Sequence, residues 1–153
     1  MMTNENTILI WGAGAIGGTL GAYFARAGED VLLVDIDRFK VVNDALGHEV
    51  GDSLLNIIGR RLLAEAGPGD TVARLPGDQF AILYCDPTGE RDIQAFTEGI
   101  RKAAARPIML EPQEVFLTAS IGVANHRDAG LGADQLMKDA AIALYEAKRR
   151  GSD

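Results

Sequence analysis

The sequence predicts an α/β domain in which helices cover the faces of one central sheet. Three observations lead to this fold class: a continuous apolar strand at 30–35, two apolar strands joined by a short turn within 71–85, and three segments whose apolar residues recur at helical spacing. The chain has 153 residues, 47% of them hydrophobic and 24% charged, which suits a soluble protein with a core of its own. We therefore expect residues 1–153 to form a single domain.

Composition narrows the possible functions. A net charge of −7 and a pI near 4.8 argue against a nucleic-acid or anionic membrane surface, but not against a nucleoside triphosphate that arrives with divalent cations. Cys85 is the only cysteine, so no internal disulfide or cysteine-based zinc site forms. With no apolar run of about 20 residues and no basic leader, we expect a cytoplasmic protein.

The N-terminal part of the sequence, up to residue 35, is predicted to form a strand, a turn, a helix and a second strand. Residues 7–11 are an apolar strand, and a glycine-rich turn at 12–18 leads into a small-residue helix that Gly28 ends. The strand at 30–35 is too continuously apolar to have a solvated face. A short helix at 41–46 is closed by Gly47. Asp52 or Ser53 then caps a long helix whose buried stripe comprises Leu54, Leu55, Ile58 and Leu62.

The remaining elements follow from the same patterns. A turn at 67–70 precedes the hairpin, in which Leu75-Pro76-Gly77-Asp78 suits a type II turn with Pro at its second position and Gly at its third. A helix is predicted at 91–105, a strand at 115–123, and a last helix at 133–149. The side chains expected to face inward from the last helix are Leu136, Met137, Ala140, Leu144 and Tyr145.

Two fingerprints occupy the chain, and the first is a glycine loop. Gly12, Gly14 and Gly17 follow a strand and open a helix, and Asp35 ends the next strand, as in dinucleotide sites. Residues ~7 to 35 resemble the start of NAD(P)-binding Rossmann domains, especially ketopantoate reductases. This resemblance implies NAD(P) as an alternative ligand, although the chain has no room for a second half-sheet and a substrate domain.

The second fingerprint consists of four ordered segments: VDIDRFKVVNDALGHEVGDSLL, ARLPGDQF, ASIGVA and ALYEAKRRG. Over residues ~31 to 151 they resemble the GGDEF domain of diguanylate cyclases, which condense two GTP molecules into cyclic di-GMP. The resemblance implies a palm-type α+β fold, with a ferredoxin-like mixed sheet at 31–153 preceded by the strand-loop-helix of 1–30. It also implies Mg²⁺ or Mn²⁺ as cofactor, and a homodimer for catalysis.

By this resemblance, Asp35 and Asp78 are the catalytic carboxylates, and with the Ile36 carbonyl they ligate the metal. The other matching positions imply contacts with the nucleotide. The backbone amides of 38–40 would bind the phosphates, and an amide and a carboxylate on two helices would bind guanine. The turn glycine and the last helix would make further contacts. These residues are Arg38, Phe39, Lys40, Asn43, Asp52, Gly77 and Lys148. Two alternatives stay open: Asp52 as only a helix cap, and Lys148 as a solvated helix end.

The signature departs from the family at two positions of its turn. Pro76 replaces a glycine and lacks an N–H, while Gln79 replaces a glutamate and supplies neither charge nor base. The sequence therefore predicts a domain that binds Mg·GTP with weak or absent synthesis of cyclic di-GMP, so its status as an enzyme is open. The alternative is a regulatory GTP-binding module beside an EAL-type phosphodiesterase or sensor domain. The arginine of the product-inhibition motif is also missing, because Gly67 precedes Asp70 at the required spacing.

Asp35 belongs to both fingerprints, as the acidic residue of the dinucleotide pattern and as a metal ligand of the GGDEF pattern. In a Rossmann sheet strand 7–11 pairs beside strand 30–35, whereas a palm-type sheet gives both edges of strand 30–35 to the hairpin and to strand 115–123. We favour the palm-type pairing, with strand 7–11 at a sheet edge or exchanged with another molecule. The abrupt junction also suggests a chimera, engineered or natural.

Overall fold

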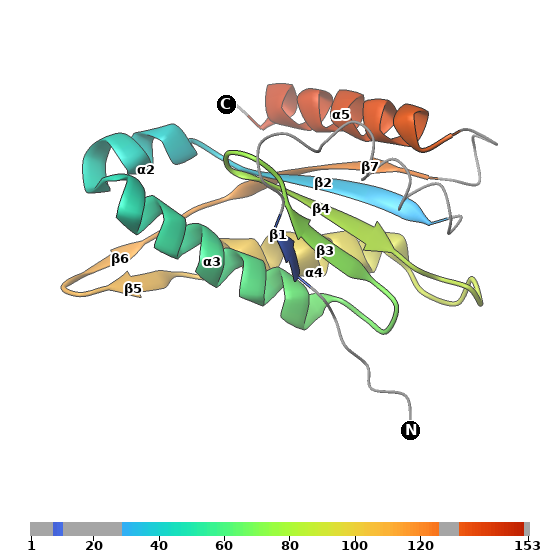
Figure 1. The fold of residues 1–153 in the computed structure, drawn as a ribbon, viewed down its shortest axis with the longest axis horizontal. Helices are drawn as coiled ribbons and strands as arrows, with labels where there is room; N and C mark the ends of the chain where they lie inside the picture. The colour runs from blue at the N-terminus through green and yellow to red at the C-terminus, as the bar shows by residue number, and fades with distance from the viewer. Residues whose placement is uncertain (1–7, 11–28, 126–131, 152–153) are drawn as a thin grey trace.

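The computed structural model describes residues 8–10, 29–125 and 132–151 (Figure 1). Its main sheet has five strands in the order β1-β3-β4-β2-β7. Their bounds are β1 Ile8–Ile10, β2 Asp30–Ile36, β3 Thr71–Arg74, β4 Gln79–Tyr84 and β7 Ala119–Ala124. β2 pairs antiparallel with β4 on one side and with β7 on the other. The predicted fold class, a palm-type mixed sheet with helices on its faces, is therefore confirmed.

Strand β1 lies at the edge of the sheet and runs parallel to β3, with Ile8 opposite Val72 and Ile10 opposite Arg74. It is separated from β2 by β3 and β4, so the neighbouring placement that a dinucleotide-binding sheet requires is not present. This agrees with the palm-type alternative. The loop glycines Gly12, Gly14 and Gly17 lie outside the described residues.

Helices cover the two faces of the sheet (Figure 1). On one face α3 (His48–Glu65) and α4 (Ile93–Ala105) pack over the side chains of β2 that include Leu32, Val34 and Ile36. On the other face α5 (Ala133–Arg150) packs over β7 and β2. The alternation along β2 places Val31 and Leu33 beneath α5, and Asp35 is in phase with them.

A glycine sets how closely α5 approaches the sheet. A Cβ atom on Gly122 of β7 would lie 2.2 Å from the carbonyl oxygen of Ala140 and 2.3 Å from the backbone nitrogen of Leu144. Only a residue without a side chain permits this approach. The inward stripe of α5 then runs through Leu136, Ala140 and Leu144, and Lys148 is the next residue at a spacing of four.

The predicted start of the long helix is wrong, although its buried stripe is confirmed: Leu54, Leu55, Ile58 and Leu62 are all buried. Helix α3 begins at His48, directly after α2 (Phe39–Leu46), and its N-cap is Gly47. Gly47 has φ +89°, which reverses the chain in one residue and needs no polar cap. Asp52 and Ser53 therefore lie inside the helix.

Two predictions for the C-terminal half are also wrong. The single strand at 115–123 is instead two elements: β6 (Gln113–Val115) forms a separate hairpin with β5 (Ile108–Leu110), and β7 begins at Ala119. The chain changes sheets at Phe116, whose side chain is exposed. Tyr145 points outward and is 63% exposed, with the Arg149 guanidinium over its ring.

No helix in the described ranges is long and apolar enough to cross a bilayer.

Candidate functional site

The candidate site is built around Asp35, near the end of central strand β2. Cross-strand register places Gln79 opposite Asp35 on β4 and Ser120 opposite it on β7. Residues that are directly opposite share a face of the sheet, so all three point toward the α5 side. Asp35 is only 4% exposed, which is unusual for a carboxylate and requires compensation by donors or cations.

Two nitrogen groups provide part of that compensation. Gln79 donates from Nε2 to Oδ2 of Asp35 at 2.7 Å, and the Lys148 ammonium lies 2.5 Å from Oδ1. The ammonium pairs with Oδ1 by charge and proximity, but Oδ1 has no hydrogen bond of ordinary geometry within the described residues. A buried carboxylate oxygen without a directed donor is available to a further ligand.

The turn of the β3–β4 hairpin brings Asp78 beside Asp35. Gly77 has φ +82°, as the predicted type II turn requires at its third position, and the Leu75 N–H donates to the Gln79 carbonyl at 2.9 Å. The backbone N–H of Ile36 donates to the Asp78 carbonyl at 3.0 Å, which ties the turn to the end of β2. Burial, and next the charge of Asp35, raise the pKa of the Asp78 carboxyl.

These carboxylates pass a test for a divalent cation. Two carboxylates close enough for the charge of Asp35 to raise the pKa of Asp78, with one buried oxygen that no hydrogen bond from the described residues satisfies, are a donor set that suits Mg²⁺ or Mn²⁺. The predicted ligands Asp35, Ile36 and Asp78 are thus adjacent. Within the described residues, no cluster of three or more His, Cys, Asp or Glu side chains forms a cation site.

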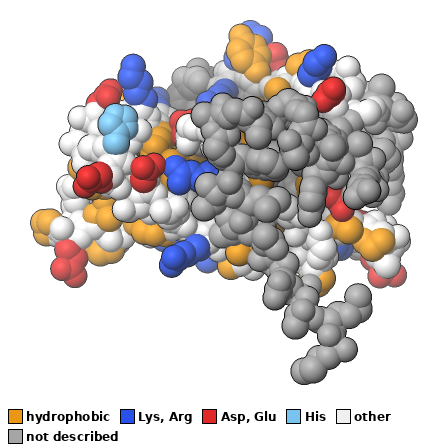
Figure 2. All heavy atoms as spheres, in the orientation of Figure 1, with side chains coloured by type: hydrophobic (Ala, Val, Ile, Leu, Met, Phe, Trp, Pro, Cys, Tyr) orange, Lys and Arg blue, Asp and Glu red, His pale blue; other side chains and the backbone are white. Residues whose placement is uncertain are grey.

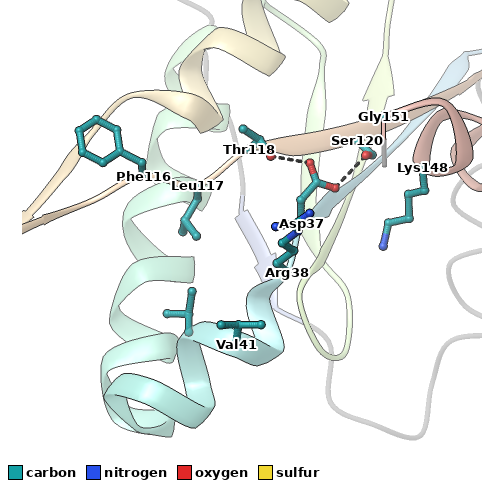
Figure 3. Close-up of a pocket in the computed structure, with 10 residues that line it drawn as sticks. Asp37, Arg38, Val41, Phe116, Leu117, Thr118, Ser120, Lys148 and Gly151 are labelled. Atoms are coloured by element: carbon teal, nitrogen blue, oxygen red, sulfur yellow. Dashed lines mark hydrogen bonds between the residues drawn. The ribbon is translucent and has the colours of Figure 1, made fainter. Parts of the chain in front are cut away.

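The turn after β2 is held by a network that the sequence did not reveal. Asp37 accepts hydrogen bonds from Thr118 Oγ1 at 2.7 Å and from Ser120 Oγ at 2.8 Å (Figure 3). The next residue, Arg38, has φ +55°, which is rare for a residue with a side chain. Since no side chain caps α2 at Arg38, the first amide groups of this helix are presented at the site.

Two open pockets flank this turn. A pocket of about 610 Å³ contains most of the predicted nucleotide residues and adds His48 and Arg74. The predicted residues that line it are Phe39, Lys40, Asn43, Asp52, Gly77 and Asp78. A second pocket of about 500 Å³ is lined by Arg38 and Lys148 together with Asp37, Val41 and Phe116 (Figure 3). The structure therefore divides the predicted residues between two neighbouring hollows.

The larger pocket presents an amide and a carboxylate from two helices. A Cβ on Gly51 would lie 1.8 Å from Asn43 Oδ1, so this glycine lets α2 and α3 come together around the Asn43 side chain. Asp52 is exposed and pairs with Arg74 from β3 at 3.0 Å, with its other carboxylate oxygen outside that pair. Asp52 is thus oriented by an arginine and is not a cap. The sequence signal available for Arg74 was its position directly before the Leu75–Asp78 turn, at the end of β3.

The face in Figure 2 carries acidic and basic side chains interspersed with apolar ones over its described part.

Fold and site agree with the comparisons with known proteins. The family described as diguanylate cyclase, GGDEF domain, matches residues 24–153, and the chain belongs to this family. Among its relatives, the bifunctional diguanylate cyclase/cyclic di-GMP phosphodiesterase MucR of Pseudomonas aeruginosa is 39% identical over 121 residues, which are 79% of this chain and 18% of MucR. Diguanylate cyclase TpbB of the same species is 38% identical over 125 residues, 80% of this chain and 29% of TpbB.

A solved EAL/GGDEF domain protein from M. capsulatus has the same fold, with a TM-score of 0.77 and 37% identity over 87% of each chain. The chain spans less than a third of the length of the two curated relatives above.

Proposed function

We propose that this domain binds GTP together with a divalent cation and synthesises cyclic di-GMP weakly or not at all. The observation that carries the proposal is the Gln79 amide, which occupies Oδ2 of the buried carboxylate Asp35 at 2.7 Å. In the family signature this position is a glutamate. An amide neither holds a second negative charge beside the metal ligands nor accepts a proton from an attacking hydroxyl.

The larger pocket supports guanine as the base. Asn43 and Asp52 offer one amide and one carboxylate, which together complement the carbonyl and N–H groups of guanine. Arg74 engages only Oδ1 of Asp52, so it fixes the carboxylate and leaves Oδ2 to the base. Adenine lacks the matching N–H donors, so we expect GTP to bind more tightly than ATP.

The start of α2 and the end of α5 support phosphate binding. The uncapped amides after Arg38 carry the partial positive charge of a helix N-terminus, and Lys148 approaches from the opposite side. Arg38 itself has a left-handed backbone conformation, φ +55°, a type of outlier that is common at ligand sites.

Asp35, Asp78 and the Ile36 carbonyl would hold Mg²⁺ or Mn²⁺, which neutralises phosphate charge and activates the attacking hydroxyl when bound. Synthesis joins two GTP molecules, so an active form requires two copies of the site facing one another. We propose that any turnover is confined to such a homodimer. Because MucR and TpbB are several times longer than this chain, we also propose that the parent protein carries an EAL-type or sensor domain.

Calorimetric titration with GTP and Mg²⁺ tests the binding proposal, with ATP as the competitor of the same charge. Asp35→Asn is expected to abolish cation-dependent GTP binding, whereas Glu49→Gln, an exposed acid on α3, serves as the charge-matched control. Equal affinity of wild type and Asp35→Asn would refute the metal-ligand assignment. Chromatographic assay of cyclic di-GMP then separates a weak cyclase from the alternative, a regulatory module that binds GTP without converting it.

A further inference from the structure

The last helix places a cation where the site expects a metal ion. Lys148 lies 2.5 Å from Oδ1 of Asp35, the same oxygen that lacks a directed hydrogen bond. The Asp35 side chain is 5% exposed, and the Lys148 ammonium is a positive charge in contact with it that offsets the cost of burial. Gln79 contributes a dipole at Oδ2 but no charge.

The contact between Lys148 and Asp35 is suited to exchange. At Asp35 the contact is an ion pair in which Oδ1 accepts no directed hydrogen bond from the described residues, so a second cation at this oxygen would replace one charge by another without breaking a hydrogen bond to Oδ1. The Lys148 side chain is 42% exposed, and its four-carbon stem reaches into the pocket of about 500 Å³ that it lines with Asp37 and Arg38 (Figure 3). The ammonium therefore has open space beside its present position.

We propose that Lys148 occupies the place of the divalent cation in the nucleotide-free protein, so that the two cations compete for Oδ1 of Asp35. This competition makes the empty site a poor binder of divalent metal. Resting on the proposed function, the inference extends to nucleotide binding: the phosphates draw Lys148 away from Asp35, and the vacated oxygen then accepts the metal. Metal and nucleotide would consequently enter the site together.

The test measures Mn²⁺ binding without nucleotide, by electron paramagnetic resonance of the free ion. Lys148→Met keeps an unbranched apolar side chain only one atom shorter than lysine but removes the charge, and is expected to raise Mn²⁺ affinity about tenfold. Arg149→Met is the matched control, because Arg149 lies on the same turn of α5, is exposed, and pairs with Glu146. The control is expected to leave Mn²⁺ affinity unchanged.

The same variant is expected to weaken GTP binding in the presence of Mg²⁺, so one substitution moves the two affinities in opposite directions. Unchanged or weaker Mn²⁺ binding by Lys148→Met would overturn the competition. A double variant Lys148→Met/Asp35→Asn locates the gained ion: the gain disappears if the ion is on Asp35, and its persistence would equally overturn the inference. Helical circular dichroism checks that α5 is intact in each variant.

The two proposals fail separately. If no variant binds GTP but Lys148→Met gains Mn²⁺ affinity, the proposed function is wrong and the competition at Asp35 is supported. If GTP and Mg²⁺ bind as proposed but Lys148→Met gains nothing, the competition is wrong and the function stands.

Discussion

Two buried carboxylates lie at opposite ends of the β3–β4 hairpin, and they are compensated very differently. Asp70, before β3, accepts hydrogen bonds from the Gly67 and Cys85 backbone amides and a bidentate pair from Arg91 at 2.6 and 2.7 Å. Asp35, beside the turn, has one amide donor and one imperfectly directed ammonium. Both are under 5% exposed, yet only Asp70 is fully satisfied. Complete satisfaction is what a structural carboxylate requires, whereas the Asp35 oxygen that the described residues leave unsatisfied is consistent with the ligand-binding role proposed above.

The Asp70 cluster also stands where the family's product-inhibition motif would be. Arg91, packed 4.2 Å from the Tyr84 ring centroid, reaches Asp70 from the loop before α4. A Cβ on Gly67 would lie 2.9 Å from the Arg91 guanidinium, so an arginine at 67 and Arg91 in its present place are incompatible. In this domain the Asp70 carboxylate therefore pairs with Arg91 inside the protein.

The largest expected effect is loss of stability when the satisfied carboxylate is removed. Asp70→Ala leaves the Arg91 guanidinium and two amides without their acceptor, and we expect unfolding free energy to fall by about 3 kcal/mol. Urea denaturation measures this loss. A change as small as that of an exposed acid such as Glu49→Gln would show that Asp70 does not fasten the hairpin.

Asp35→Asn provides the opposite half of the comparison. The amide oxygen still accepts from Gln79 and Lys148 moves into solvent, so we expect stability to change by no more than about 1 kcal/mol while cation-dependent GTP binding is lost. Parallel denaturation and calorimetry on the two aspartate variants measure both quantities. If Asp35→Asn destabilised the fold as much as Asp70→Ala, the distinction between the two carboxylates would be wrong.

Gln79→Glu adds a third negative charge beside Asp35 and Asp78. Without metal we expect a loss of about 1 kcal/mol from like-charge repulsion, and saturating Mn²⁺ should restore it because the cation binds only the folded site. Thermal unfolding with and without Mn²⁺ measures the recovery, and cyclic di-GMP formation is expected to rise. Gln79→Leu, which removes the hydrogen bond without adding charge, should show a smaller Mn²⁺-dependent gain in stability than Gln79→Glu.

The smallest effect concerns pH. Because folding raises the pKa of Asp78, through burial first and Asp35 second, the folded state binds this proton more tightly than the unfolded chain. The resulting stability is fully present below the unfolded pKa of about 3.9 and is lost as pH rises through the folded pKa. Asp78→Asn should flatten this part of the pH–stability curve, measured by denaturation from acidic to neutral pH. A steeper decline in the variant would reverse the assignment.

Sequence reasoning reached the centre of the fold because the relevant patterns are local. The uninterrupted apolar run of β2 indicated a strand covered on both faces, and the spacing of Leu54, Leu55, Ile58 and Leu62 gave the α3 stripe. It failed where backbone geometry outweighs side-chain type. Gly47 starts α3 without the polar cap that Asp52 and Ser53 suggested, and the chain leaves its strand at Phe116 despite an apolar sequence.

The site shows the same division. The resemblance supplied Asp35, Asp78 and Lys148, whereas the residues alone left Lys148 open as a solvated helix end. The Gln79–Asp35 hydrogen bond required the cross-strand register of β2 and β4, and the Asp37 contacts required the register of β2 and β7. Such pairs join residues more than 40 positions apart, which no local pattern specifies.

Gly122 determines how close α5 lies to the sheet. Helix α5 rests against this glycine at Ala140 and Leu144, and Lys148 lies about one helical turn beyond Leu144. Because the helix is rigid over that length, the distance between helix and sheet at Gly122 sets how far the ammonium reaches toward Asp35. A methyl group at position 122 would push α5 away from the sheet and so move Lys148 away from Asp35. The charge balance of the proposed nucleotide site is thus adjustable from Gly122, a residue outside the set proposed to contact nucleotide and metal.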